Sequence, residues 1–119
     1  MSPDGGEVRV RPVLGVPEIA AGDPLGELIA KCAGGLKDGD VVVISQKVVS
    51  KAEDRLRDLD DIEPGPQARE LAAEHGKDPA LVELVLAESS RIVRAAGGVL
   101  ITETHSGLIC ANAGIEASN

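Results

Sequence analysis

The chain has 119 residues, of which 43% are hydrophobic, 27% are charged and none is aromatic. This composition predicts a single globular domain, or part of a larger one, whose core is built from valine, isoleucine, leucine and alanine. The formal net charge of −8 and the lack of aromatic stacking side chains argue against binding to nucleic acid or to an anionic membrane surface.

The first half of the chain predicts two strands and two helices. Residues 7–13 alternate charged and apolar side chains, which is typical of a half-buried strand. After a loop, Asp23 and Pro24 are typical of a helix N-cap and first turn, and this helix runs to about Cys32. Residues 41–44, "VVVI", predict a short strand covered on both faces, and a short helix follows over residues 45–53.

The second half predicts two helices and two strands. The helices span residues 66–75 and 79–90, with Asp78 as a cap and Pro79 as the first helical residue of the second. Residues 97–114 read as two strands joined by a turn at 105–107. A buried stripe is expected on the second helix at Leu81, Val82, Val85 and Leu86. The fold class expected is α+β, with a mixed sheet and several short helices.

The cysteines and the apolar segments indicate in which cellular compartment the protein is expected. Cys32 and Cys110 lie far apart and form no CxxC motif, so reduced thiols are the simpler interpretation. No signal peptide is expected, because no charged segment is followed by an apolar one near residue 1, and the apolar runs are shorter than a membrane span requires. A cytoplasmic protein is therefore expected.

The segment "SQKVVSK", residues 45–51, is the first candidate site. A helix starting at Gln46 would place Lys47 and Lys51 on one face, close to a helix N-terminus that favours anions. Together with Gln46 and a serine of this segment, the two lysines could hold phosphate oxygens. The alternative is a solvated lysine face, which is common on surface helices. The Walker P-loop pattern is absent.

The tail "ANAGIEASN" is the second candidate. Glu116 and Asn119 are three residues apart and offer oxygen ligands of the kind that suit Mg²⁺ or Mn²⁺. A single carboxylate does not make a metal site, however, and a solvated surface charge is the alternative. His75 and His105 are isolated, which argues against a zinc site.

These stretches resemble the N-terminal part of the coenzyme F420-0:L-glutamate ligase family, also called F420:γ-glutamyl ligases. The resemblance rests on "RPVLGVPEIAAGD", "DGDVVVISQKVVSKAEDR", "LAESSRIVR" and "VLITETHSGLICANAGIEASN", which occur in the family's order. It implies a GTP-dependent ligase that joins L-glutamate to F420-0 through a γ-linked amide, by way of an acyl phosphate. It also implies a divalent cation, Mg²⁺ or Mn²⁺, and a homodimer.

The resemblance also implies roles for particular residues. One GTP-contacting loop falls on residues 16–19, and further GTP contacts fall on the 46–51 segment and the tail. The first metal-ligand position falls on Glu116, where the family commonly has aspartate. The GTP contacts implied are Val16, Pro17, Glu18, Ile19, Gln46, Lys51 and Asn119.

The resemblance leaves the activity of a chain of this length open. Family members continue past Asn119 and carry further metal ligands there, so residues 1–119 are expected to be the N-terminal GTP- and metal-binding part of a truncated ligase domain. One alternative is a non-catalytic nucleotide-binding or interaction module. Another is a different metal-dependent phosphotransfer or hydrolytic enzyme on the same scaffold.

Overall fold

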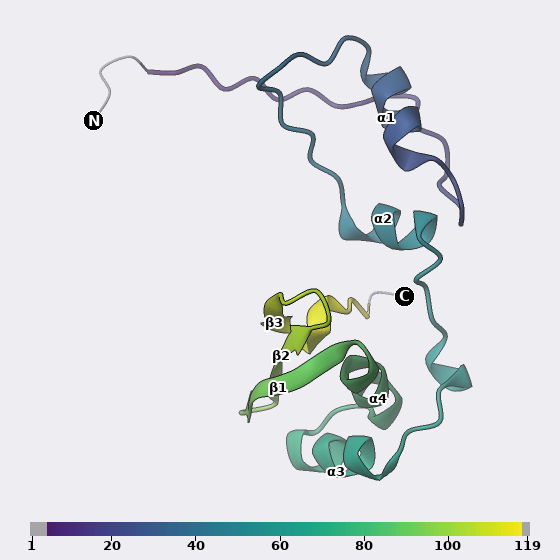
Figure 1. Cartoon of the computed structure of the whole chain (residues 1–119), viewed down its shortest axis with the longest axis vertical. Coiled ribbons are helices and arrows are strands. Elements are labelled where there is room, and N and C mark those ends of the chain that lie inside the picture. Colours follow the sequence, from purple (N-terminus) through teal and green to yellow (C-terminus); the bar gives the residue numbers. More distant parts are fainter. Residues whose placement is uncertain (1–4, 118–119) are drawn as a thin grey trace. The chain divides into compact units, whose positions relative to one another are not determined.

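The computed structural model describes residues 5–117, and the chain divides between Leu56 and Arg57 into two compact units. Within the described range the first unit contains the helices α1 (Leu25–Ala33) and α2 (Gln46–Ala52). The second contains α3 (Pro66–His75), α4 (Pro79–Ala87), three strands, and the short 3-10 helices η1 (Leu59–Asp61) and η2 (Asn112–Gly114). Figure 1 traces these elements in chain order. The α+β fold class is therefore confirmed.

The sheet of the second unit is antiparallel over its described strands, not mixed as predicted. Its strands are β1 (Ser89–Ala96), β2 (Val99–Thr104) and β3 (Ile109–Ala111), in the order β1-β2-β3. The two strands predicted over residues 97–114 are confirmed as β2 and β3. β1 was missed, because the predicted helix over 79–90 was extended into it; α4 ends at Ala87 and β1 begins at Ser89.

The core of the second unit lies between the two helices α3 and α4 and the sheet. Val82 and Val85 of α4 are fully buried against Leu100 of β2, and the small residues Ala68 and Ala72 of α3 complete the cluster. Leu81 and Leu86 pack at its edge, so the predicted stripe on α4 is confirmed. The small alanines let α3 and α4 approach each other closely. This close packing compensates in part for the lack of large aromatic side chains in the core.

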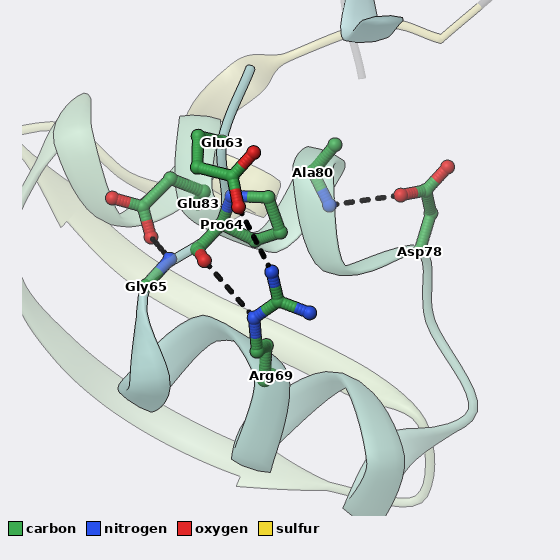
Figure 2. Close-up of polar contacts among 7 residues, drawn as sticks. All are labelled: Glu63, Pro64, Gly65, Arg69, Asp78, Ala80 and Glu83. Atoms are coloured by element: carbon green, nitrogen blue, oxygen red, sulfur yellow. Dashed lines mark hydrogen bonds and ion pairs between the residues drawn. The ribbon is translucent and has the colours of Figure 1, made fainter.

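Side-chain hydrogen bonds define where α3 and α4 begin (Figure 2). The Asp78 carboxylate accepts from the Ala80 N–H at 2.8 Å, so the predicted cap and the proline-led start of α4 are confirmed. Glu83 of α4 accepts from the Gly65 N–H at 3.1 Å, just before α3. Arg69 donates to the Pro64 carbonyl and to Glu63, both at 3.1 Å. The Glu83 contact ties the segment before α3 to α4, and the Arg69 contacts tie the same segment to α3 itself.

The first unit contains helices and loops but no strand among its described residues. Residues 7–13 and 41–44 do not form the predicted strands. Val8 and Val10 are 86% and 91% exposed, and Val41 and Val43 are 85% and 90% exposed. A strand is defined by hydrogen bonds to a neighbouring strand, and the described part of this unit supplies none to either segment.

The start of α1 also differs from the prediction. The N-cap is Pro24 and not Asp23, and no side chain caps the helix. The Asp23 carboxylate instead accepts from the Ala20 N–H at 2.8 Å, which closes the loop before the helix. The end of the helix agrees with the prediction to within one residue. The short helix predicted over 45–53 is confirmed as α2.

Candidate functional site

An ion pair in the first unit joins two segments that the sequence singled out separately. The Lys51 ammonium, on the last turn of α2, donates to the Glu18 carboxylate at 2.6 Å. The Lys51 side chain is 30% exposed, whereas that of Glu18 is 86% exposed. The stem of the lysine is thus largely covered while the carboxylate that it meets reaches into solvent.

Backbone contacts hold the loop that carries Glu18 against α2 independently of the ion pair. The Gly22 N–H donates to the Ala52 carbonyl at 2.9 Å, which ties the end of the loop to the last residue of the helix. Ile19, next to Glu18, is 6% exposed and anchors the loop by burial. The hydrogen bond between Ala20 and Asp23 closes the turn between them. The position of Glu18 beside α2 is therefore set by several contacts at once.

The lysine lowers the proton affinity of its partner. The hydrogen bond from the Lys51 ammonium, and then its positive charge, hold the pKa of Glu18 below its ordinary value, while slight desolvation acts in the opposite direction. Glu18 is therefore ionised at neutral pH and compensates the charge of Lys51. The carboxylate side of the pair is largely in contact with solvent, whereas the lysine side chain is mostly covered.

The other predicted nucleotide contacts lie around this pair. Val16 is half-buried and Pro17 exposed on the same loop, and Gln46 is the exposed first residue of α2. Gln46 and Lys51 are five residues apart, about 7.5 Å along a helix axis. Lys51 lies in the last turn of the seven-residue α2, so its ammonium and not the helix N-terminus is the positive group beside the 16–19 loop. The structure thus brings the 16–19 loop together with the lysine end of α2.

The predicted metal residue Glu116 belongs to the second unit and is exposed. It follows a left-handed turn in which Asn112, Ala113 and Gly114 have φ angles of 53°, 53° and 73°. The Ile115 N–H donates to the Asn112 carbonyl at 2.9 Å, and Ala113 and Ile115 pack against the core. Alanine rarely adopts this conformation, so packing compensates a strained backbone just before Glu116. Asn119 lies outside the described residues.

Glu116 does not make a metal site with its surroundings. Between residues 5 and 117, no three or more histidine, cysteine, aspartate or glutamate side chains come together in a way that could hold a metal ion. Glu116 offers one carboxylate of the hard oxygen type that Mg²⁺ and Mn²⁺ take. Glu116 is therefore one potential ligand and not part of a three-residue cluster among the described residues.

Sequence reasoning did not find the pairing of Glu18 with Lys51. The resemblance named both residues as nucleotide contacts, but nothing in the sequence indicates an ion pair across a separation of 33 residues. Such a contact depends on the tertiary path of the loop. The sequence carries only a weak signal for it: a loop with Gly15, Pro17 and Gly22 that must turn back on itself.

Two further properties of the described residues bear on function. Both cysteines, Cys32 and Cys110, are free thiols. Among helices in the described range, none has the length and apolar character needed to cross a bilayer.

Comparison with known proteins assigns the chain to a family. The profile of the F420-0:Gamma-glutamyl ligase family matches residues 14–119, which is most of the chain. The chain belongs to this family. The match includes the loop with Glu18, helix α2 with Lys51, and the segment with Glu116.

Curated members of the family are close relatives over nearly the whole chain. The coenzyme F420:L-glutamate ligase of Methanopyrus kandleri is 48% identical over 112 residues, which cover 94% of this chain and 44% of the relative. The ligase of the same name from Methanothermobacter thermautotrophicus is 46% identical over 111 residues, which cover 90% of this chain and 44% of the relative. The ligase of Archaeoglobus fulgidus is 43% identical over 112 residues, which cover 94% of this chain and 44% of the relative. The family member described here therefore spans less than half the length of these relatives.

Proposed function

We propose that this chain is the nucleotide-binding part of a ligase that joins L-glutamate to coenzyme F420-0 through a γ-linked amide. The observation that supports this most strongly is the 48% identity over 112 residues to a relative named coenzyme F420:L-glutamate ligase. Identity at this level over the folded part of the chain supports a shared scaffold. The proposal extends the relatives' named reaction to this chain.

The energy source proposed is GTP. A carboxylate and an amine do not condense spontaneously in neutral water, so the carboxylate must first be activated. In the proposed route an oxygen of the F420-0 carboxylate attacks the γ-phosphorus of GTP, the bond to GDP breaks, and an acyl phosphate forms. The glutamate amine then attacks the acyl carbon, loses a proton, and inorganic phosphate leaves. The products are the amide, GDP and phosphate.

Lys51 and the 16–19 loop are the residues proposed to bind the nucleotide. The Lys51 ammonium stands where a half-buried stem limits its movement, and it offers three N–H donors to phosphate oxygens. The loop that carries Val16, Pro17 and Glu18 is tied to α2 by the Gly22–Ala52 hydrogen bond. Gln46 and Asn119 complete the proposed nucleotide contacts.

Glu116 is proposed as one ligand of a divalent cation, Mg²⁺ or Mn²⁺. Such a cation, when bound, would neutralise charge on phosphate oxygens. No group of three or more acidic, histidine or cysteine side chains lies together among the described residues, so Glu116 is proposed as one ligand and not as a complete site. We further propose a homodimer in the cytoplasm, where free thiols such as Cys32 and Cys110 remain reduced.

A second candidate is a nucleotide-binding module without ligase activity of its own. The observation that favours it is that the chain spans 44% of its relatives' length. Both candidates predict guanine-nucleotide binding, but only the first predicts product.

The test has two stages. Calorimetric titration with GDP and with ADP, each with and without Mn²⁺, should show a preference for GDP. Incubation with F420-0, L-glutamate and either GTP or ATP is then followed by mass spectrometry of the F420 species. Product with GTP alone supports the ligase. GDP binding without product supports the module. Turnover with ATP, without glutamate addition, would support a different phosphotransfer enzyme.

A further inference from the structure

The ion pair between Lys51 and Glu18 is not required to hold the loop in place. Exposed ion pairs contribute little to folding, and Glu18 is 86% exposed. The hydrogen bond from Gly22 to Ala52 already ties the loop to α2, and Ile19 beside Glu18 is buried. The carboxylate at 2.6 Å from the ammonium can therefore leave it without loss of the fold.

We propose that Glu18 is a displaceable counter-charge on Lys51, and that it determines which anions can bind there. This inference rests on the proposed function, because it assigns Glu18 a role in the nucleotide site. In the free protein the carboxylate occupies the position beside the ammonium that a phosphate oxygen takes in the complex. A multiply charged phosphate displaces it, whereas a singly charged anion does not.

The difference in exposure between the two side chains makes the exchange possible. The Lys51 stem is mostly covered, so its ammonium stays close to the loop when its partner leaves. Glu18 can rotate into water at little cost, because its side chain is largely solvated already. A second anion at the ammonium would lie close to the carboxylate, and repulsion between like charges then favours departure of Glu18.

Charge explains the selectivity. Glu18 is attached to a fixed loop, so its effective concentration at Lys51 is high, and a monovalent ion such as acetate or chloride offers no stronger attraction. A diphosphate or triphosphate chain carries several charges over neighbouring oxygens and attracts the ammonium more strongly. Glu18 is in this sense a specificity-determining residue and not a catalytic one.

The test uses the full chain and tripolyphosphate as the probe, with GDP measured in parallel. Glu18→Gln keeps the shape of the side chain and removes its charge. It should tighten tripolyphosphate binding roughly two- to fivefold at low salt, the range that corresponds to release of one exposed ion pair. In Glu18→Gln sodium acetate should compete with tripolyphosphate, whereas in the parent protein acetate should not compete.

Two control variants make the result specific. Glu53→Gln removes an equal charge at the C-cap of α2, where Glu53 is also exposed, and should leave tripolyphosphate affinity close to that of the parent. Adding Glu18→Gln to Lys51→Ala should give no gain over Lys51→Ala alone, because the carboxylate then has no ammonium to compete for. An equal gain from Glu53→Gln, or a gain in the absence of Lys51, would overturn the inference in favour of a diffuse electrostatic effect.

The outcomes separate this inference from the proposed function. If GDP binds the parent but Glu18→Gln binds neither probe more tightly, the counter-charge role is wrong and nucleotide binding stands. If Glu18→Gln tightens tripolyphosphate binding while GDP binds no better than ADP, the counter-charge role stands and the guanine-nucleotide function fails. Absence of binding to both probes would overturn both.

Discussion

Lys51 is the residue on which the nucleotide site depends most directly. Replacing it by alanine removes a charge-assisted hydrogen bond to phosphate, so Lys51→Ala should weaken GDP binding by roughly 1.5–3 kcal/mol. Its effect on the free energy of unfolding should be small, because the interaction lost in the free protein is an exposed ion pair. Calorimetry and urea denaturation measure the two quantities separately.

Lys47 provides the matched control for that experiment. It lies one turn earlier on α2 and is half-buried like Lys51, and the family resemblance gives it no nucleotide contact. Lys47→Ala should therefore leave GDP affinity nearly unchanged. Equal losses at both positions would show that the helix attracts anions through its general field and not through a defined contact.

The titration of Glu18 reports directly on the ion pair. Its pKa in the folded protein lies below the ordinary value, so the stabilising contribution of the pair is fully present above the unfolded-state pKa. It is lost as the pH falls through the lower folded-state pKa. In an NMR titration of the Glu18 carboxyl carbon, Lys51→Ala should move the midpoint to higher pH. An unchanged midpoint would mean that the pair does not form in solution.

Glu116 is the residue that tests the proposed cation. Glu116→Gln keeps the size of the side chain but removes the charged oxygen ligand, so most of the gain in GDP affinity caused by Mn²⁺ should disappear while metal-free binding persists. Glu116→Asp should keep the gain, because it retains the carboxylate. Calorimetry of GDP with and without Mn²⁺ compares the three proteins. Parent-like Mn²⁺ dependence in Glu116→Gln would leave Glu116 as a solvated surface charge.

At the scale of single elements, the hydroxyl of Thr102 provides a test of the packing in the second unit. Its Oγ1 is fully buried on β2 and has no hydrogen-bond partner among the described residues. Desolvating an unpaired hydroxyl costs roughly 1–3 kcal/mol, which a methyl group of the same shape avoids. Thr102→Val should therefore raise the free energy of unfolding by about 1 kcal/mol in urea denaturation.

Thr104, two residues further along β2, is the matched control. Its hydroxyl accepts from the Leu108 N–H at 3.0 Å and lies 3.0 Å from the Ser106 hydroxyl, which holds the turn between β2 and β3. Thr104→Val should lower the free energy of unfolding, by about 1 kcal/mol for one lost hydrogen bond. Equal effects of the two substitutions would show that the Thr102 hydroxyl does find a partner in solution.

The elements that the sequence predicts well are those defined by local interactions. α3 and α4 are identified correctly because a proline-led start, a capping aspartate and a helical apolar period all act within a few residues. β1 was missed although it carried a usable signal. Gly97 and Gly98, with positive φ of 60° and 78°, form a two-residue connection between Ala96 and Val99, as expected for a tight hairpin.

Residues 41–44 show the opposite error. Their β-branched composition predicts a buried strand, yet Val41 and Val43 are 85% and 90% exposed, while Val42 and Ile44 are 41% and 42% exposed. Exposure still alternates with the period of a strand. Local preference for extended backbone is thus retained, but whether a strand forms depends on a partner that composition cannot specify.

For the whole molecule, the balance of buried and exposed apolar side chains predicts self-association. Six apolar residues are buried in the described range, and large apolar side chains are strongly exposed at Val8, Val10, Leu14, Val41 and Val43. Exposed apolar stretches of this kind mark interaction surfaces. A small core without aromatic residues gives the single chain modest stability. Binding to a second copy would stabilise the folded state by mass action.

Sedimentation velocity over a range of concentrations checks this prediction, and salt provides an internal control. The net charge of −8 opposes self-association. Raising the NaCl concentration should screen this repulsion and so strengthen self-association. Substituting Val41 and Val43 together by asparagine should weaken self-association without unfolding the chain, because both side chains are almost fully exposed and contribute little to the core. The same double substitution leaves the Lys51–Glu18 pair in place, so GDP binding should persist in the dissociated protein. A well-folded parent that remains monomeric at high protein and salt concentrations would contradict the prediction, and the exposed valines would then be simply solvated.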